Sequence, residues 1–494
     1  MAAKSNRTKQ PTAIPSAEGR GPQYFLVAFS VIFGLFLGLC LLKFGNPPIM
    51  EKYVTQPTDI YELIFGYPWP IAWAYRLLAF VALLGIASGL ALRKQALERR
   101  RTAGRPSAAD KARPAPKWLI ALPAVWLLWE MIAGTKSVDL HLTNPTLTHF
   151  TACVACFYLG LFCLGRVTNL WPFWLGLLAA FLLVLAEGWE QHFGGLEQSR
   201  RYFFSEVYPG MKEIPPEYLK KITSDRIFST MFYPNALAGA LLLLLPPTLG
   251  LLLTCRRFTM AARYFLAAVI GLAALLCLYW SGSKGGWLLT LLLGIASFLK
   301  FPVRQQVKVA LISAILVLGL AGFFARYLGF FQKGATSVSA RFDYWRAAIQ
   351  TTREHPLFGT GPGTFSIAYQ KLKRPESEMS RLAHNDYLQQ ACDSGVPAFL
   401  AYTAFVVGCM VWSLRHGRVG GDWRVFSLWL GVLGWSLQST VEFGLYLPAL
   451  VWPAFTFLGF LLATHKVAAE QAITLSEAEI TQKQSKTGRF LPQN

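Results

Sequence analysis

The sequence predicts an all-α, polytopic integral membrane protein with about 12 transmembrane helices. Of its 494 residues, 54% are hydrophobic and 15% are charged, whereas about a quarter of the residues in soluble domains are charged. Apolar runs long enough to cross a bilayer recur along the whole chain. The net charge of +21 then fits basic residues that flank spans and contact anionic lipid headgroups. It does not indicate a nucleic-acid-binding protein.

Twelve apolar segments are expected to be membrane spans. The first is long for a signal-peptide core and lacks a clear A-x-A cleavage site, so we expect an uncleaved span. Most of the eight cysteines lie inside apolar runs, where they serve as small packing residues rather than disulfide partners or metal ligands. The predicted spans are 24–42, 68–92, 117–134, 147–165, 171–187, 233–254, 262–280, 286–299, 306–325, 395–414, 423–439 and 446–464.

The distribution of basic residues predicts that both termini are cytoplasmic. With that orientation, 27 of the 47 lysines and arginines fall on the cytoplasmic side, many of them in short linkers such as 255–263. The two long outer loops, 188–230 and 326–396, hold 15 of the other 20, and the positive-inside rule largely discounts long loops. The larger loop, 326–396, therefore lies on the outer face between the ninth and tenth helices.

The chain divides into four parts by composition. A cytoplasmic tail (1–23) precedes the N-terminal transmembrane helices (24–165), and a transmembrane core (166–465) carries both outer loops. The last part, 466–494, is expected to be a disordered cytoplasmic tail. The cytoplasmic loop 93–117 is also polar and basic, and we expect it to be disordered too.

A polar cluster at the end of the larger outer loop is the first candidate site. It runs from Arg381 to Gln390 and contains His384, Asn385 and Asp386. An imidazole beside cations at the membrane surface suits proton transfer on an anionic, lipid-borne substrate. The alternative is a histidine that makes ordinary structural hydrogen bonds.

Two further outer-face motifs carry cations. In Ser281-Gly-Ser-Lys284-Gly-Gly-Trp287, glycines expose backbone amides next to a lysine, which suits a phosphate group. The alternative is a tight helical hairpin with a snorkelling lysine. Arg341 opens an amphipathic segment that runs to about Glu354, and an arginine fork grips two phosphate oxygens at once. That segment is equally consistent with an interfacial helix held by salt bridges.

Four passages resemble the O-antigen ligase and O-antigen polymerase superfamily of bacterial envelope glycosyltransferases. The resemblance covers roughly residues 170–460, and the chain has Lys284 where the family usually has arginine, so bidentate phosphate contact is lost there. The passages are Arg226 to Ala238 with its N-A-L-A helix start at Asn235, Ser281 to Trp287, Arg341-x-x-Tyr-Trp345 with the later Pro356 to Phe365, and His384-Asn385-Asp-Tyr-Leu388-Gln389 with Gly395.

The resemblance implies a metal-independent, inverting glycosyltransferase that needs no cofactor. Its donor would be a glycan on an undecaprenyl-pyrophosphate carrier at the periplasmic face of the inner membrane. His384 would be the general base, Arg341 and Lys284 would stabilise the leaving pyrophosphate, and Asn385 or Asp386 would orient the imidazole. The other implied substrate-binding residues are Arg226, Asn235, Arg346, Arg381 and Asn385, and Glu442 in the last outer turn is a further candidate.

Several functions remain open at this stage. Within the family, an O-antigen ligase, a polysaccharide polymerase and a protein O-glycosyltransferase share these motifs, and the acceptor is a glycolipid such as lipid A-core or a growing polysaccharide. A transporter or flippase for lipid-linked glycans with 12 helices would explain the span count, but it predicts internal repeats or functional charges within spans. A non-catalytic assembly scaffold would tolerate loss of His384.

Overall fold

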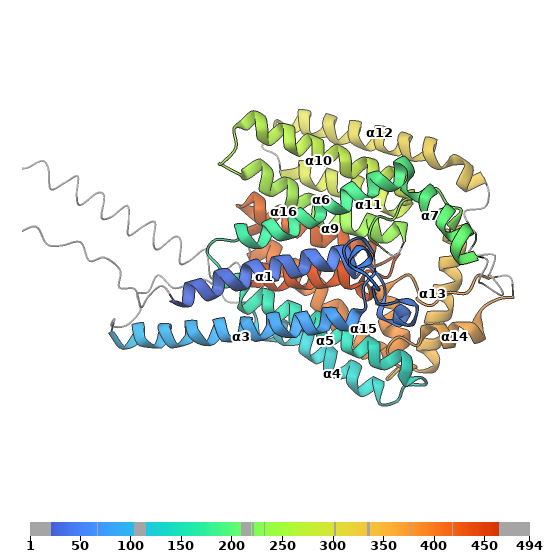
Figure 1. Cartoon of the computed structure of the whole chain (residues 1–494), viewed down its shortest axis with the longest axis horizontal. Coiled ribbons are helices and arrows are strands. Elements are labelled where there is room, and N and C mark those ends of the chain that lie inside the picture. The colour runs from blue at the N-terminus through green and yellow to red at the C-terminus, as the bar shows by residue number, and fades with distance from the viewer. Residues whose placement is uncertain are drawn as a thin grey trace, which may run out of the picture.

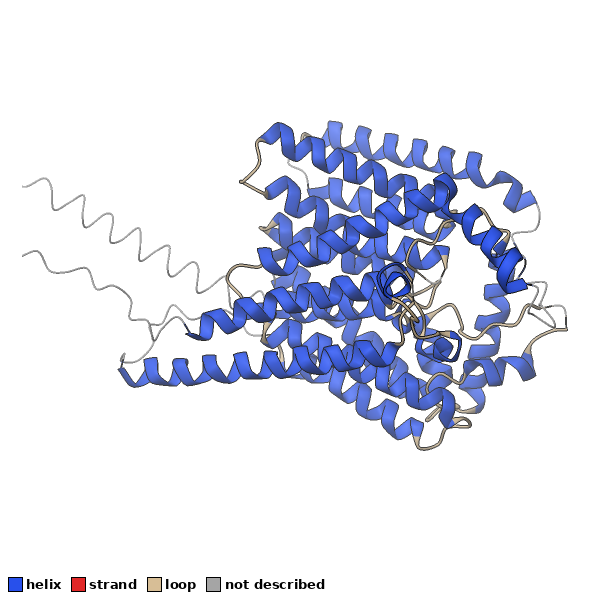
Figure 2. Ribbon diagram, in the orientation of Figure 1, coloured by secondary structure: helices blue, strands red, loops and turns tan. Residues whose placement is uncertain are grey.

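The protein is all-helical throughout the described part of the chain, in a computed structural model that describes residues 21–66, 68–102, 115–208, 219, 222–231, 233–300, 303–332, 336–375, 377–416 and 418–463 (Figure 2). The main helices are α1 (Gly21–Lys43), α3 (Ile71–Thr102), α4 (Lys117–Gly134), α5 (Leu140–Phe162), α6 (Trp171–Glu190), α9 (Pro234–Thr254), α10 (Met260–Ser281), α11 (Lys284–Lys300), α12 (Gln305–Gln332), α13 (Thr336–Glu354), α15 (Asp386–His416), α16 (Trp423–Gln438) and an unlabelled last helix, Pro448–Ala463. The short elements are η2 (Pro48–Tyr53), α2 (Ile60–Phe65), η3 (Leu164–Arg166), η4 (Gln191–Gly195), α7 (Leu196–Tyr202), η5 (Phe203–Val207), α14 (Phe365–Leu372), η7 (Arg418–Gly420) and η8 (Gly444–Tyr446).

The prediction of an all-α membrane protein is confirmed. Among the described residues, nine helices are long and apolar enough to cross a bilayer. The other three predicted spans correspond to shorter helices, namely α11, α16 and the last helix. The total of twelve spans and the cytoplasmic position of both termini therefore stay predictions, and most of the two tails lies outside the described residues.

Three segments predicted as loops contain more helix than expected, and in the loop 188–230 this helix comprises the end of α6, η4, α7 and η5. Residues 93–102 continue α3 instead of opening a disordered loop, because leucine, arginine, lysine, glutamine and glutamate are all strong helix formers. The larger outer loop holds the end of α12, all of α13 and α14, and the first turns of α15. The amphipathic segment predicted to end near Glu354 is α13, which begins five residues before Arg341.

The last helix forms the centre of the bundle. It is buried along its whole length apart from half-buried Phe460, as expected for a helix that is apolar on every side. Its neighbour α5 approaches so closely that a methyl group added at Gly160 would lie 2.1 Å from the carbonyl oxygen of Thr456. Glycine permits this backbone contact, as it does between other membrane helices. Sixteen residues span only about 24 Å, which suffices because protein, not lipid, surrounds this helix.

The bundle has two distinct ends. Figure 1 shows α13 and α14 together at one end, opposite the first turn of α1 and the last turn of α3. Helix α13 packs on α14 and on α15. These polar segments therefore cap one end of the helices that cross the bundle.

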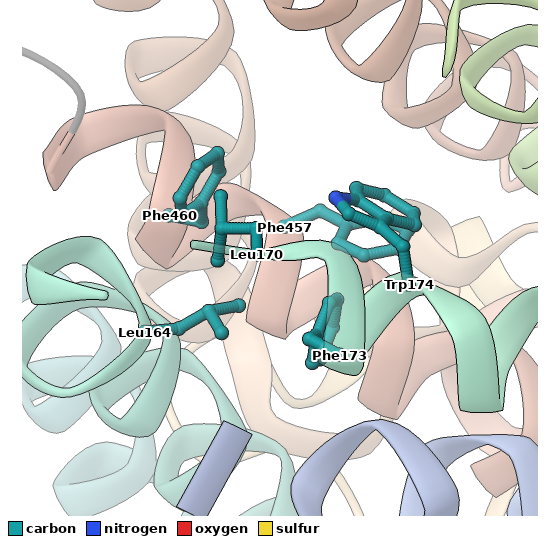
Figure 3. A pocket seen from close by; sticks show the side chains of 6 residues that line it. All are labelled: Leu164, Leu170, Phe173, Trp174, Phe457 and Phe460. Atoms are coloured by element: carbon teal, nitrogen blue, oxygen red, sulfur yellow. The ribbon is translucent and has the colours of Figure 1, made fainter. Parts of the chain in front are cut away.

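The apolar crevice in Figure 3 lies where η3 and the start of α6 meet the last helix. It is lined by leucine and aromatic side chains, and the rings of Trp174 and Phe457 lie 5.5 Å apart. It contains no group that can transfer a proton or bind an anion. We assign it to packing.

A glycine-rich turn fixes the segment between α13 and α15. Gly359, Gly361 and Gly363 all have positive φ (60°, 113° and 80°), a conformation that glycine adopts readily, which accounts for the glycines in this turn. The turn is bonded to the first half of α15, because Gly361 N donates to Asp393 O (2.7 Å). α15 itself breaks at Gly395, with φ 84° and ψ 173°. The predicted span 395–414 therefore begins at this break, while the helix N-terminal to it belongs to the outer segment.

Replacing Gly395 with alanine should destabilise the protein by about 3 kcal/mol or more. The backbone conformation is one that only glycine adopts readily, and a Cβ would lie 2.0 Å from Leu357 O. Thermal unfolding of the purified protein measures the effect. Gly329→Ala is the matched control, because a Cβ there meets nothing within 4 Å. Equal melting temperatures for the two variants would contradict this account of the turn.

Candidate functional site

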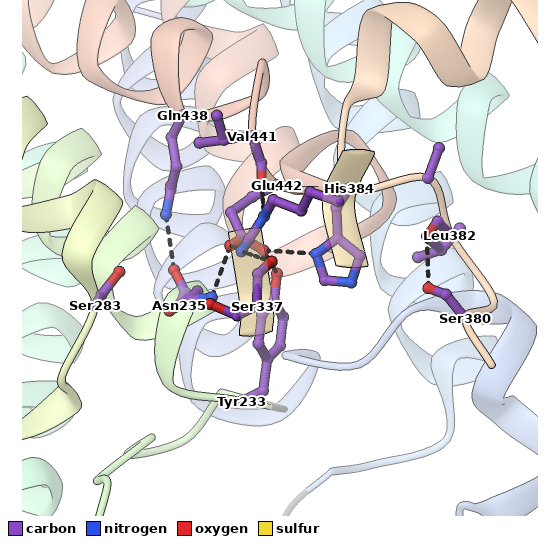
Figure 4. Close-up of polar contacts among 12 residues, drawn as sticks. Tyr233, Asn235, Ser283, Ser337, Ser380, Leu382, His384, Gln438, Val441 and Glu442 are labelled. Atoms are coloured by element: carbon purple, nitrogen blue, oxygen red, sulfur yellow. Dashed lines mark hydrogen bonds and ion pairs between the residues drawn. The ribbon is translucent and has the colours of Figure 1, made fainter. Parts of the chain in front are cut away.

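A buried carboxylate, Glu442, is the centre of a polar network that includes Tyr233, Asn235 and His384 (Figure 4). Its Oε1 accepts hydrogen bonds from Asn235 Nδ2 (2.6 Å) and from Arg341 Nη2. Its Oε2 accepts from the Tyr233 hydroxyl (2.9 Å) and lies 3.1 Å from His384 Nδ1. These partners come from the start of α9, from α13 and from the segment before α15. One carboxylate thus joins three parts of the chain that are far apart in sequence.

Glu442 is ionised in this environment. Burial by itself would raise the pKa of the carboxyl, but the Arg341 guanidinium and the hydrogen bond from His384 outweigh burial and lower the pKa to about 2. A charged acceptor fixes the roles of its partners. Since Oε2 has no proton to give, His384 Nδ1 must carry the hydrogen, and Nε2 is left as the basic nitrogen of the neutral ring.

The backbone and the aromatic neighbours of His384 also hold its ring in place. His384 has a φ of 51°, an uncommon left-handed conformation for a residue other than glycine. Its ring stacks on Tyr344 (centroids 5.6 Å apart) and meets the edge of Phe443 (4.8 Å). Trp345 Nε1 donates to His384 O (3.4 Å). The imidazole is half-buried, with its orientation set from several sides.

Arg341 is fixed by three hydrogen bonds from its guanidinium. Nε donates to Val441 O (2.9 Å), Nη1 donates to Ser337 O (3.0 Å), and Nη2 donates to Glu442. A guanidinium has five N–H groups, so two remain available for an anion. A lysine could not reproduce this geometry.

Arg226 and Asn235 extend the network toward the turn between α10 and α11. Arg226 Nη2 donates to Asn235 Oδ1 (2.9 Å), and Arg226 Nε donates to Ser281 O (2.7 Å). Gln438 at the end of α16 donates to Asn235 O (2.8 Å). The motif around Arg226 and the glycine turn around Lys284, predicted separately, therefore meet at one place.

Lys284 begins α11, two residues before the predicted span 286–299. Its ammonium lies 3.9 Å from the ring centroid of Phe330 and 5.0 Å from that of Tyr327. Burial, followed by the positive charges of Arg226, Arg341 and Arg326, lowers the pKa of Lys284 to about 8. Lys284 therefore forms a cation cluster with Arg226, Arg341 and Arg326. Arg326 was not among the predicted site residues.

Three of the predicted substrate-binding residues take no part in the Glu442 contacts. Arg346 is exposed and lies 3.6 Å from Asp343, on α13 itself. Arg381 is exposed on the segment before α15. Asn385 caps α15, because its Oδ1 accepts from Leu388 N (3.0 Å).

The expectation that Asn385 or Asp386 orients the imidazole is not what the geometry gives. Asp386 Oδ2 accepts from Leu445 N (2.8 Å), and the carboxylate beside His384 is Glu442. From the sequence, Glu442 was only a further candidate, and Tyr233 was not predicted as a site residue. The available signal was a single acidic residue in the turn 439–447 between two apolar segments.

A second group of buried polar residues, centred on Asp393 and Glu130, lies around the start of α15. Asp393 Oδ2 accepts from Gly363 N (2.9 Å), Gln389 Nε2 (3.2 Å) and the Tyr446 hydroxyl (3.4 Å). Glu130 of α4, which is fully buried, accepts from the Ser394 hydroxyl (2.5 Å). These carboxyl groups bind the glycine turn and α4 to the start of α15, so they hold the His384 segment against the bundle.

Comparison with known proteins points to one superfamily. Residues 266–403 match the family described as O-Antigen ligase, and that stretch contains Lys284, Arg341 and His384. An uncharacterized protein of Haemophilus influenzae is 28% identical over 164 residues, which cover 28% of this chain and 40% of that protein. The chain thus matches less than half the length of that relative. Segment 266–403 of this chain is therefore similar to the O-antigen ligase family, in agreement with the resemblance of its motifs.

Proposed function

We propose that the protein is an O-antigen ligase-like glycosyltransferase at the outer face of the bacterial inner membrane. It moves a glycan from an undecaprenyl-pyrophosphate carrier to a hydroxyl group of an acceptor such as lipid A-core. One observation carries the proposal: an ionised, buried Glu442 holds an imidazole and an arginine fork, with two further cations, Arg226 and Lys284, beside them.

The reaction is a single displacement. His384 Nε2 removes the proton from the acceptor hydroxyl as its oxygen bonds to the anomeric carbon of the donor sugar. The bond from that carbon to the phosphate oxygen breaks, and its electron pair leaves with the polyprenyl pyrophosphate. Attack opposite the leaving group inverts the anomeric centre. Glu442 keeps Nδ1 protonated and stabilises the imidazolium that forms, as the carboxylate does in catalytic triads.

The cations bind the leaving group. The free N–H groups of Arg341 and Arg226 and the Lys284 ammonium supply the positive charge that a departing pyrophosphate requires. Their mutual repulsion, which lowers the pKa of Lys284, is relieved when an anion binds between them. In this proposal the protein's own cations stabilise the negative charge on the leaving pyrophosphate, and the reaction is metal-independent.

Arg341→Ala should reduce glycan transfer about a hundredfold, the usual cost of removing one charge-stabilising donor. The test compares envelope glycans on gels from cells that express the wild-type protein or the variant as their only copy. Arg353→Ala, an exposed arginine near the end of the same helix, is the matched control. Arg341→Lys should recover little activity, since the fork is lost.

The species that accumulates identifies the acceptor class. Carrier-linked long chains in the Arg341→Ala strain would indicate a ligase, and carrier-linked single repeat units would indicate a polymerase. Full transfer by Arg341→Ala, with protein levels equal to wild type, would contradict the proposed role of the cation cluster.

A further inference from the structure

An open hollow lined by basic side chains lies at the opposite end of the bundle from Glu442. Its volume is about 620 Å³, and Arg256, Arg263 and Arg424 line it together with Thr254 and Asp422. Three guanidinium groups and one carboxylate give these lining residues a net charge of +2. Asp422 is already engaged, because its Oδ1 accepts from Arg424 N (2.8 Å) as the cap of α16. The hollow therefore presents an excess of positive charge.

Two helices, α9 and α10, place the hollow about one membrane thickness from the candidate site. Helix α9 begins beside Asn235 in the Glu442 network and ends at Thr254 in the hollow, and its 21 residues span about 30 Å. Helix α10 runs back from the hollow to Ser281, which binds Arg226. Since α9 and α10 are candidate spans, the hollow lies at a membrane–water interface.

Arg424 and Arg263 are held in place by hydrogen bonds that leave some of their N–H groups available. Arg424 bridges two helices, because its Nε donates to Thr254 Oγ1 (2.8 Å) and its Nη2 donates to Thr254 O (3.1 Å). Arg263 Nε donates to Phe258 O (2.9 Å), and Arg256 is exposed. The other N–H groups of these side chains are the kind of donors that grip phosphate oxygens.

An apolar surface adjoins this charge. On the first turns of α10, directly beside the hollow, Met260, Tyr264 and Phe265 are 64%, 60% and 68% exposed. In a helix that crosses the bilayer, such a surface contacts acyl chains. A ligand that fits both features has an anionic head and hydrocarbon tails.

We infer that this hollow binds the headgroup of an anionic phospholipid, with the acyl chains along the exposed face of α10. The phosphate lies among Arg256, Arg263 and Arg424. Basic pockets between membrane helices bind such headgroups in other proteins, and the attraction of anionic lipid to surface arginines supplies part of the affinity. The site is separate from glycan transfer, because it uses none of the residues around Glu442.

Native mass spectrometry of the full-length protein in detergent tests the inference. Phosphatidylglycerol should bind in preference to phosphatidylcholine, and Arg256→Gln combined with Arg263→Gln should weaken phosphatidylglycerol binding at least about threefold. Arg256→Gln alone, which leaves the bond to Phe258 intact, should show a smaller loss. The matched control is Arg257→Gln, because Arg257 lies in the same loop but stacks over Trp171 (5.9 Å).

Three results would overturn the inference. Equal binding of phosphatidylglycerol and phosphatidylcholine would show that the site does not select for charge. If Arg257→Gln weakened phosphatidylglycerol binding as much as Arg256→Gln does, the loop would act only through its net charge. Competition by glycerol phosphate at concentrations equal to the lipid would identify a soluble anion as the ligand. All of these readouts are independent of glycan transfer, so they stand even if the proposed function fails.

Discussion

Replacing His384 with asparagine is expected to reduce glycan transfer about a thousandfold, because the acceptor hydroxyl loses its general base. Asparagine is the preferred replacement at this position. It adopts the left-handed conformation of His384 (φ 51°) more readily than most residues do, so the segment before α15 keeps its shape. Alanine there would mix the loss of the base with backbone strain.

The measurement is transfer by the purified protein from a carrier-linked glycan to its acceptor. Donor binding should change little in His384→Asn, because the cations that hold the pyrophosphate are intact. His355→Ala is the matched control, since His355 is an exposed histidine that follows α13 directly. If His384→Asn transfers glycan as fast as wild type, His384 is not the base.

Replacing Glu442 with glutamine is expected to reduce transfer by a similar factor, about a thousandfold, with the shape of the side chain unchanged. Glutamine carries no charge, so it neither fixes Nδ1–H of His384 nor balances Arg341. The loss of an orienting carboxylate in a catalytic triad has an effect of this order. Because Glu442 touches both functional groups, its loss and the loss of His384 should not be additive.

The same variant makes a prediction about stability and pH. The pKa of Glu442 is lowered to about 2 in the folded protein, below its ordinary value of 4.5. A lowered carboxyl pKa stabilises the fold above the ordinary value and loses that effect as the pH falls toward the folded value, an effect on the order of 3 kcal/mol here. The melting temperature of wild type should therefore exceed that of Glu442→Gln at pH 7, and the difference should shrink between pH 4.5 and pH 3.

Glu354→Gln supplies the control for this experiment. Glu354 is exposed at the end of α13 and contacts Gln350 of the same helix, so its charge should leave the melting temperature unchanged at every pH. A stability difference for Glu442→Gln that does not vary with pH would show that the carboxylate acts through packing rather than charge.

The sequence by itself determined the class of the protein and the kinds of residue at its site. Apolar runs must be helical in a bilayer, because every backbone amide has to be bonded within its own segment, and this predicts α1 through the last helix from composition alone. His384, Arg341 and Lys284 stood out because polar residues are rare in such a chain, whereas Arg226 was singled out only by the resemblance to a known family. The prediction that they share the outer face of the membrane rests on counting charges in short linkers.

Only the tertiary structure decided which of these residues meet. Glu442 was one acidic residue in an apolar turn, and no spacing rule links it to His384, 58 positions away, or to Asn235, 207 positions away. The packing of α9 against α16 and of α13 against α15 brings them together. The same packing leaves Arg346 beside Asp343 and uses Asn385 as a helix cap. Helix formation depends on residues that are neighbours in the sequence. A site depends on contacts between helices, and the pattern of residues along a single sequence does not specify those contacts.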